Sequence, residues 1–379
     1  MSSKVIWMDA LTPKQALLFS YLAKELLGAG FRPIVTTRRH ELTCEILAKH
    51  GVEHVVLGEY GGKSLYSKLL SFANRQLLLT KWLKSLPDTP LAHISFTSPD
   101  STRVAFGLGI PSIQLTDSPH SDKVNRLTLP LATKVITPTC VSSEVMKYLV
   151  DKNTLISFEG VFEVIWVKRM SYDNTELKNL NLVPYKYCIV RPPESKAYYY
   201  AYYKDPFDLF LSLTEKLSKR ITVVFYPRYQ DQLEVARQMA KKEENIVVLD
   251  RAMNMQALER YAALIVTGGA TLGQEAALLG TPSIIAFPKE LATVRFLKEK
   301  GFPVYHEPKN FISLSLEILK DPKRYRVQTE RLLEDLEDPL PLVLKTIDEI
   351  TGHGEKHAGI QSHVNTCSSQ PQQRKLYMD

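Results

Sequence analysis

A glycine pair, Gly268 and Gly269, separates an apolar run that ends at Thr267 from a stretch with helical spacing. Glycine lets the backbone turn tightly and lets a phosphate group approach without a Cβ in the way. A helix that starts after the pair would offer free amide groups and the positive end of its dipole to that phosphate. The spacing therefore predicts a phosphate-binding turn between a strand and a helix.

Two polar side chains of the predicted helix extend this site. Thr271 could cap the helix and donate its hydroxyl to a phosphate oxygen, and Glu275 lies one turn later on the same face. A carboxylate there can accept both hydroxyls of a ribose. Because plain crossovers also use glycines, the pair alone is a weak signal. The more specific signal is the whole order of apolar run, glycine pair and helical stretch, which continues through Gly280 and Pro282 into another apolar run.

Three arginines follow predicted strands in the same half of the chain: Arg191, Arg228 and Arg251. Ligands bind outside the carboxyl ends of parallel strands, where cations could hold a leaving diphosphate and stabilise its growing charge. The alternative is that these arginines are solvated, as charged side chains usually are. No Asp-x-Asp pair occurs, so we expect neither a metal ion nor another cofactor.

Candidate bases lie at predicted strand ends in the first half of the chain. Asp9, Asp100 and Asp117 each follow such a strand, and His120 lies in the loop after Asp117. Histidine is the readiest base at neutral pH. Aspartates also cap turns and helices, so a structural role stays open for Asp117 and is favoured for Asp122.

The apolar pattern predicts the scaffold that must position these residues. Short runs that are apolar at nearly every position alternate with helical stretches, which is typical of parallel strands covered by helices on both faces. This alternation predicts right-handed crossovers and doubly wound α/β sheets, that is, Rossmann-like domains. The predicted strands are residues 5–8, 33–37, 54–57, 92–97, 112–116, 134–138, 155–159, 187–191, 222–226, 246–249, 264–267 and 283–286.

The pattern restarts after a polar segment near residues 164–183, so we predict domains at residues 1–165 and 166–351. Residues 352–379 are rich in Gly, Ser, Gln, Asn and His and hold few core-forming residues, which predicts a disordered tail. The four cysteines are scattered without a Cys-x-x-Cys pair. This favours a reducing cytoplasm over a disulfide framework or a zinc site.

The order of residues 263–285, ALIVTGGATLGQEAALLGTPSII, resembles the donor-binding segment of GT-B glycosyltransferases and of the related UDP-N-acetylglucosamine 2-epimerases. The resemblance implies two Rossmann-like domains that face each other across a cleft. The second, C-terminal domain would hold the nucleotide, the first would serve the acceptor, and the helix at residues 341–351 would cross back to the first domain. The start IWMDALTPKQALLFSYLAKEL and residues 125–138, NRLTLPLATKVITP, are similar to the mainly archaeal domain-of-unknown-function family 354. Fold alone does not decide the reaction.

The likeness to the epimerases extends through residues 93–126. It implies that Asp100 and Asp117 occupy the positions of a catalytic aspartate and a glutamate. Asn125 and Arg126 match the asparagine–arginine pair of that family, and would contact the substrate.

Other positions depart from the epimerase pattern. Lys123 stands where a second catalytic glutamate is expected, and Arg191 stands near an expected histidine. The Gly-Thr-Arg-Pro turn after the first strand is replaced by residues 10–13. An epimerase needs several titratable groups to remove and return a proton. A transferase must mainly hold a leaving diphosphate and position an acceptor, so these cations favour transfer.

The favoured hypothesis is transfer of a sugar from a nucleotide-sugar donor, such as a UDP-sugar, to a lipid or glycan acceptor in envelope or glycan assembly. A nucleotide-sugar 2-epimerase or hydrolase is the second hypothesis, and a non-catalytic nucleotide-sugar-binding protein is the third. The formal charge of +7 fits anionic partners and equally a plain solvated surface. No RNA-binding motif occurs, so no nucleic-acid partner is predicted.

Residues 63–86, KSLYSKLLSFANRQLLLTKWLKSL, hold five basic residues and no acidic ones. Such a helix could lie on an anionic membrane, which would make a cytoplasmic protein peripheral at the inner membrane face. The alternative, favoured for the apolar stripe, is a helix that covers the sheet, although its basic face would still lack a partner. No apolar run is long enough to cross a membrane. The apolar stripe comprises Leu65, Leu69, Phe72, Leu79, Trp82 and Leu83.

The tyrosines of residues 198–203 could stack on a sugar or join the domains.

Overall fold

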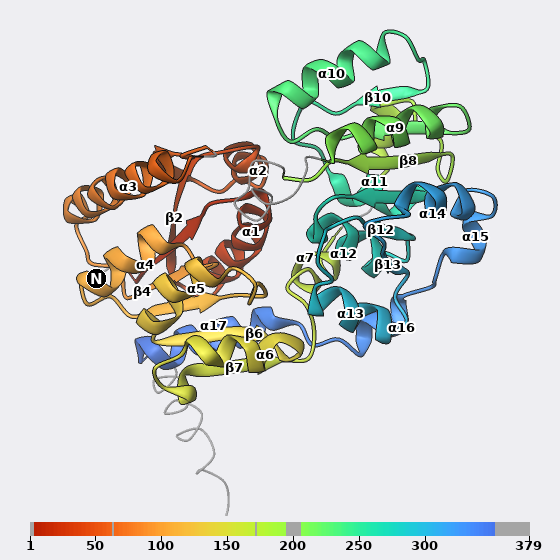
Figure 1. The fold of residues 1–379 in the computed structure, drawn as a ribbon. Coiled ribbons are helices and arrows are strands. Elements are labelled where there is room, and N and C mark those ends of the chain that lie inside the picture. The colour runs from red at the N-terminus through yellow and green to blue at the C-terminus, as the bar shows by residue number, and fades with distance from the viewer. Residues whose placement is uncertain (1–3, 63, 171–172, 195–205, 353–379) are drawn as a thin grey trace, which may run out of the picture.

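The structure is a computed structural model of the 379-residue chain and describes residues 4–62, 64–170, 173–194 and 206–352. Lys63, the tyrosine cluster and residues 353–379 of the predicted tail lie outside the described residues. Figure 1 shows two α/β units side by side, the first built from the N-terminal part of the chain. No described helix has the length and apolar content that a membrane crossing requires.

The first unit is a parallel sheet of seven described strands in the order β3-β2-β1-β4-β5-β6-β7. Every residue of the central strand β1 is buried, because helices cover both faces of the sheet. The strands are β1 (Val5–Ala10), β2 (Arg32–Arg39), β3 (His54–Glu59), β4 (Ala92–Ser95), β5 (Ser112–Leu115), β6 (Lys134–Pro138) and β7 (Leu155–Phe158). The helices are α1 (Pro13–Gly28), α2 (Thr43–Lys49), α3 (Leu65–Ser85), α4 (Pro99–Gly107), α5 (Asp122–Thr128) and α6 (Thr139–Val145), with short 3₁₀ turns at Leu129–Leu131, Met146–Tyr148 and Lys152–Thr154.

The second unit repeats this plan with six described parallel strands in the order β10-β9-β8-β11-β12-β13. The strands are β8 (Tyr187–Arg191), β9 (Thr222–Phe225), β10 (Ile246–Val248), β11 (Leu264–Thr267), β12 (Ser283–Ile285) and β13 (Val304–His306). The helices that follow β7 in the chain are α7 (Val164–Val167), α8 (Thr175–Asn179), α9 (Phe207–Ser218), α10 (Gln230–Ala240), α11 (Met255–Tyr261), α12 (Ala270–Leu278), α13 (Ala292–Glu299), α14 (Phe311–Ile318), α15 (Pro322–Tyr325), α16 (Glu330–Glu334) and α17 (Pro339–Thr351). The predicted α/β class with two Rossmann-like sheets is confirmed.

Two details of the second unit differ from the sequence prediction. The edge strand β13 was not predicted, because three residues between Pro303 and Glu307 give no readable alternation. The sequence pattern also predicts one helix at about residues 323–338, whereas the structure has two short helices, α15 and α16. Between them the Arg326 guanidinium donates to the carbonyl oxygens of Arg260 (3.1 Å) and Ala262 (2.5 Å), which holds this segment in an extended form.

The last helix, α17, packs against β4 and α7 and so lies on the first unit (Figure 1). Asp338 caps it by accepting a hydrogen bond from the Leu340 amide, and Pro339 occupies its first turn. Its buried side chains Leu340, Val343 and Ile347 join the apolar core of the first unit. The same core continues into α12 and α13 of the second unit, so apolar packing joins the two units below the cleft.

Candidate functional site

A cavity of about 990 Å³ lies between the two units. Residues at the ends of β1, β2, β4 and β5 line one side of it, and residues at the ends of β8, β9 and β11 line the other. Both parallel sheets therefore point the carboxyl ends of their strands at one space, the usual place for a ligand in such sheets. The predicted site residues that line it are Asp100, Asp117, His120, Arg191, Arg228, Gly269, Thr271 and Glu275.

The glycine turn is crowded, most tightly at Gly268. A Cβ on Gly268 would lie 2.4 Å from the Cβ of Pro193, and a Cβ on Gly269 would lie 2.8 Å from an Arg228 nitrogen. Gly269 is itself the N-cap of α12. Thr271 therefore lies inside the first turn and does not cap the helix, which corrects the capping role predicted for it.

Two arginines form a cationic wall beside this turn. Arg191 ends β8 and pairs in register with Thr267, so its side chain emerges next to the turn. It stacks on the Tyr226 ring, with 4.1 Å from the guanidinium carbon to the ring centroid. Arg228 Nε donates to the Pro192 carbonyl oxygen at 3.0 Å. Both guanidinium groups are thus held in place by backbone and ring contacts from their own unit.

Glu41, from the first unit, reaches across the cleft to this cationic wall. Its carboxylate oxygens lie 3.7 Å from Arg228 Nη1 and 3.9 Å from Arg191 Nη2. The residue follows β2 in a left-handed conformation, with φ of 44°, which turns its side chain out of the strand direction. An anion therefore already occupies the neighbourhood of the two arginines.

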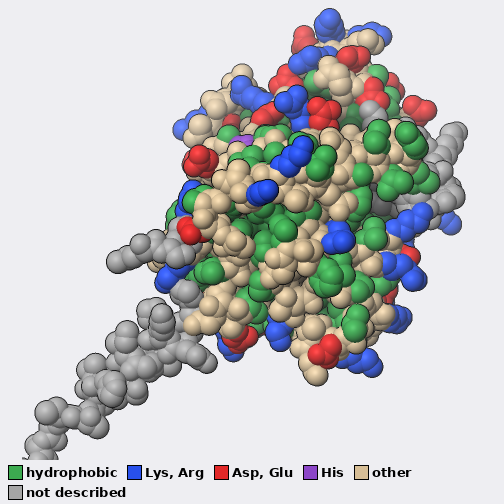
Figure 2. Space-filling view, turned by 90° about the vertical axis from the view of Figure 1, so that its left-hand side faces the viewer, with side chains coloured by type: hydrophobic (Ala, Val, Ile, Leu, Met, Phe, Trp, Pro, Cys, Tyr) green, Lys and Arg blue, Asp and Glu red, His purple; other side chains and the backbone are tan. Residues whose placement is uncertain are grey.

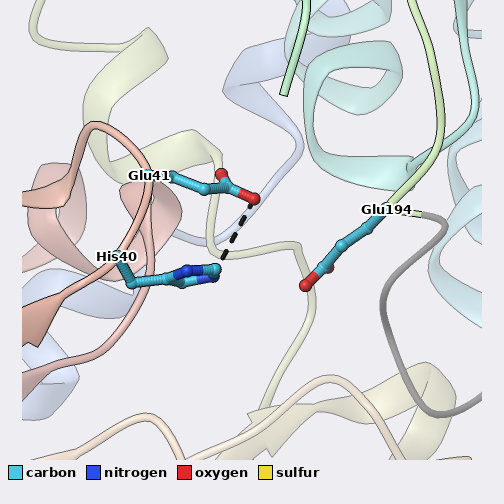
Figure 3. Close-up of side chains that lie close together, drawn as sticks. All are labelled: His40, Glu41 and Glu194. Atoms are coloured by element: carbon cyan, nitrogen blue, oxygen red, sulfur yellow. Dashed lines mark ion pairs between the residues drawn. The ribbon is translucent and has the colours of Figure 1, made fainter. Parts of the chain in front are cut away.

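His40 and Glu194 flank Glu41, and the three side chains converge in Figure 3. Their ligand atoms lie within 4.8 Å of one another, close enough for one metal ion. Burial lowers the pKa of His40 to about 4 despite the nearby Glu41, so its ring is neutral at pH 7. The two arginines already compensate Glu41, and a divalent cation would have to compete with both. The geometry favours an anion site over a metal site here.

Glu275 lines the cavity, and its carboxyl group also contacts residues behind the cavity wall. Its Oε1 accepts a hydrogen bond from Trp166 Nε1 at 2.8 Å. Burial, reinforced by the charge of Glu163, raises its pKa to about 7. Glu259 lies behind it, fully buried, and its carboxyl group contacts that of Glu275. Burial and the proximity of Glu275 raise the pKa of Glu259 as well.

Lys14 sits between two carboxylates at the floor of the cavity. Its Nζ lies 2.5 Å from Asp117 Oδ2 and 2.8 Å from Glu163 Oε1. Burial raises the pKa of Asp117, but the Lys14 charge outweighs burial and keeps that pKa below its usual range. Asp117 is therefore a fixed anion, and the structure gives it a positive partner that the sequence analysis missed.

His120 follows Asp117 and faces the second unit, with 6.2 Å between its ring centroid and that of Phe287. Burial lowers its pKa, although Asp117 acts in the opposite direction. A neutral imidazole that lines the cavity next to a fixed carboxylate is a suitable general base, because the carboxylate would stabilise the imidazolium once it forms.

Asp100 belongs to a buried ion cluster. Arg75, from α3, binds Asp9 through both terminal nitrogens at 2.6 and 3.0 Å and contacts Asp100 at 3.1 Å. Ser98 and Thr36 each donate a further hydrogen bond to Asp9 at 2.6 Å. Burial raises the pKa of Asp9, but Arg75 more than offsets it and brings the value to about 2. The Asp100 carboxylate is thus engaged, although it lines the cavity.

Four of the predicted binding residues do not line the cavity. Gly268 contributes only by letting residue 193 approach. The Asn125 amide donates to the Ser118 and Pro119 carbonyl oxygens and shapes the loop that carries His120. Arg126 is exposed and pairs with Asp122 at 3.0 Å on its own helix. Arg251 is exposed, and the cavity begins at the next residue.

Several cavity residues were not predicted from the sequence, although they lie near carboxyl ends of parallel strands, where ligands usually bind. Lys14 follows β1, and Arg38, His40 and Glu41 follow or end β2, so all four lie near carboxyl ends of strands. If every polar residue after a predicted strand of the first half had been taken as a candidate, these residues would have been included.

Comparison with known proteins places the chain in a family. Residues 4–351 match the model of a protein family described as "Protein of unknown function (DUF354)", and the chain belongs to that family. An uncharacterized protein of Methanocaldococcus jannaschii is 29% identical over 350 residues, which cover 90% of this chain and 97% of that protein.

Solved structures share the fold. UDP-GlcNAc 2-epimerase from Neisseria meningitidis, bound to UDP-GlcNAc, superposes with a TM-score of 0.70 at 14% identity, over 91% of this chain and 100% of the other. Spinosyn forosaminyltransferase superposes with a TM-score of 0.60 at 13% identity, over 92% of this chain and 100% of the other. The chain thus has the GT-B-like architecture of epimerases and glycosyltransferases, and these low identities speak to the fold alone.

Proposed function

We propose that this protein binds a nucleotide sugar in the cavity and transfers its sugar to a lipid or glycan acceptor without a metal ion. One observation carries the proposal: Arg191 and Arg228 converge with the Gly268–Gly269 turn on one wall of the cavity. A fold neighbour bound to UDP-GlcNAc supports a ligand of this class.

In this proposal the diphosphate lies against the cationic wall. The amino end of α12 presents backbone amides, and the guanidinium groups of Arg191 and Arg228 present charge in the same place. Charge develops on the diphosphate as its bond to the sugar breaks. Pre-positioned donors stabilise that charge without reorganising during the reaction.

Glu275 would accept the ribose hydroxyls in its ionised form, with Trp166 fixing one carboxyl oxygen. His120 would remove the proton from the acceptor hydroxyl, and Asp117 would stabilise the resulting imidazolium. Lys14 keeps Asp117 ionised, so Asp117 serves as a positioning and charge-stabilising residue and does not take the proton itself.

The second candidate is an epimerase, and the observation in its favour is that Asp100 and Asp117 both line the cavity. Against it, the Asp100 carboxylate is bound by Arg75 and Asp117 is bound by Lys14. Incubation with a UDP-sugar in heavy water separates the two reactions. Deuterium entering the sugar C2 position would support epimerisation, whereas acceptor-stimulated release of UDP without exchange supports transfer.

Nucleotide binding can be tested with a matched pair of arginine variants. Arg228→Gln removes charge from the cationic wall, and Arg251→Gln removes an exposed charge outside the cavity. Calorimetric titration with UDP and UDP-GlcNAc is expected to show about 10- to 100-fold weaker binding for Arg228→Gln, the usual range for a lost charged hydrogen bond. Arg251→Gln should bind like the unmodified protein. Equal affinities for both variants would overturn the assignment of the wall.

A further inference from the structure

Helix α3 has two faces of different character. Arg75, Leu79 and Leu83 recur every fourth residue and are its buried side chains, which attach it to the first unit. The opposite face carries Tyr66, Leu70 and Leu77, which are 76%, 60% and 53% exposed. Leu65 and Leu69 lie on the side of Leu79 and Leu83 but at the start of the helix, where they are 59% and 66% exposed. The predicted stripe therefore only partly faces the sheet, because its first two leucines point to solvent.

The apolar exposure continues beyond α3. Helix α4 packs beside α3, and Phe106 and the adjoining Leu108 are 55% and 48% exposed. Figure 2 looks onto this side of the first unit and shows hydrophobic side chains gathered across it, with basic side chains among them. We call Leu65, Tyr66, Leu69, Leu70, Leu77, Phe106 and Leu108 the apolar face. A group of large exposed apolar side chains on one side of a protein is typical of an interaction site.

The exposed charged side chains of the two helices are of one sign. The exposed charged side chains of α3 and α4 are Lys81, Lys84 and Arg103, and no acidic side chain of either helix is exposed. Lys81 and Lys84 continue the line of Leu70 and Leu77 along α3, since they follow Leu77 at helical spacing. Two copies of this surface would repel each other, so its charge complements an anionic partner.

The apolar face also adjoins the cavity. Leu65, Lys68, Ser71 and Phe72, from the first two turns of α3, line the cavity wall, and Leu65 is exposed on the apolar face as well. A surface that touches this face is thus beside the opening through which a lipid-borne acceptor could enter.

We propose that the apolar face docks on an anionic lipid bilayer, with Leu70 and Leu77 entering the headgroup region and Lys81 and Lys84 contacting lipid phosphates. Such a helix lies in the interface plane and does not cross the membrane. The docking is independent of catalysis. The further consequence, that the acceptor is a membrane lipid, rests on the proposed transfer.

Arg75 takes no part in this docking, because its charge is neutralised by Asp9 and Asp100 inside the molecule. This corrects the sequence-based expectation that all basic residues of 63–86 form one exposed face. Charge reversal at Arg75 would disturb the fold, so it is unsuitable as a test of lipid binding.

The test is co-sedimentation of the full chain with vesicles, without any nucleotide. Vesicles of phosphatidylcholine mixed with phosphatidylglycerol should bind the protein, vesicles of phosphatidylcholine alone should not, and salt should release it because the attraction is screened. The double variants Leu70→Glu/Leu77→Glu and Lys81→Glu/Lys84→Glu should each bind at least about tenfold more weakly. Leu209→Glu, at a leucine 49% exposed on α9, is the matched control and should bind normally.

Melting curves would show that each variant is folded, since all the substituted side chains are exposed. Equal sedimentation of the unmodified protein with both vesicle types, or an unchanged Leu70→Glu/Leu77→Glu variant, would overturn the proposal. A dimer in sedimentation velocity that this variant dissociates would assign the face to a second copy of the chain instead. Normal vesicle binding with no lipid glycosylation would leave the docking intact and reject the lipid acceptor.

Discussion

The two units bury carboxyl groups beside the same cleft in opposite ways. In the first unit Asp9 is surrounded by Arg75, Ser98 and Thr36, and every contact favours its ionised form. In the second unit Glu259 and Glu275 approach each other without a cation at salt-bridge distance among the described residues, and their pKa values rise. The first arrangement is complete in itself, as a structural element should be.

The difference suggests separate roles for the two regions. A buried, poorly compensated carboxyl pair is unfavourable for folding, and such groups gather at functional sites. Ribose hydroxyls would supply Glu275 with donors in addition to Trp166. The Asp9–Arg75–Asp100 cluster needs no ligand, which favours a scaffold role for Asp100 over catalysis.

The largest expected effect comes from breaking the complete cluster. Arg75→Met would remove the cation that forms salt bridges with both buried aspartates, Asp9 and Asp100. We expect it to lower the free energy of unfolding by about 3–5 kcal/mol. Urea denaturation would measure the loss. Lys81→Met changes an exposed lysine of the same helix and should cost far less; a similar cost for both would remove the distinction between the two regions.

The two regions should also respond to pH in opposite directions. The folded-state pKa of Glu275 is about 7 against an ordinary 4.5, so the folded protein holds a proton that the unfolded chain has released. Its favourable contribution is present below about pH 4.5 and is lost as the pH rises through 7. Asp9, with a pKa near 2 against 3.8, contributes above pH 3.8 and loses that contribution as the pH falls through 2.

Glu275→Gln would therefore be more stable than the unmodified protein at pH 8, by about 1–3 kcal/mol, and the gain should shrink toward pH 5. Thermal unfolding across this range would measure the difference. A gain that does not depend on pH would show that Glu275 is not the titrating group.

The affinity for UDP should distinguish Glu275, which is proposed to contact the ligand, from its buried neighbour Glu259. Glu275→Ala is expected to weaken UDP binding by about 1–3 kcal/mol, because it removes a charged acceptor from the cavity. Glu259→Gln leaves Glu275 in place and changes a side chain that does not line the cavity, so this variant should bind UDP as well as the unmodified protein does. Unchanged calorimetric affinity for Glu275→Ala would reject the ribose contact.

The smallest effect concerns Glu41, whose carboxylate lies near Arg191 and Arg228 from across the cleft. Glu41→Gln removes a competing anion and should tighten UDP binding by about 0.5–1 kcal/mol. Glu45→Gln serves as its control, because Glu45 also crosses the cleft, to the Ala252 amide, without touching the arginines. Weaker UDP binding by the Glu41 variant would mean that Glu41 positions the arginines rather than competing for them.

Local sequence determined most of the scaffold. Apolar runs bounded by glycine and proline locate the described strands other than β13, and the glycine pair after β11 locates the turn that opens to the cavity. These features are readable because strand burial and tight turns depend on residues close together in the chain. The division into domains at residue 165, and the roles assigned to the site residues, remain predictions.

Only the tertiary structure decided how the charges are paired. Arg75 looked like part of a basic helical face, yet it meets Asp9 from 66 residues away, and Lys14 meets Glu163 from 149 residues away. Trp166 reaches Glu275 across 109 residues. A charged residue on a helix has the same local pattern whether its partner is water, lipid or a buried aspartate. The choice is made by what the folded chain brings within a few ångströms, where desolvation and Coulomb attraction act.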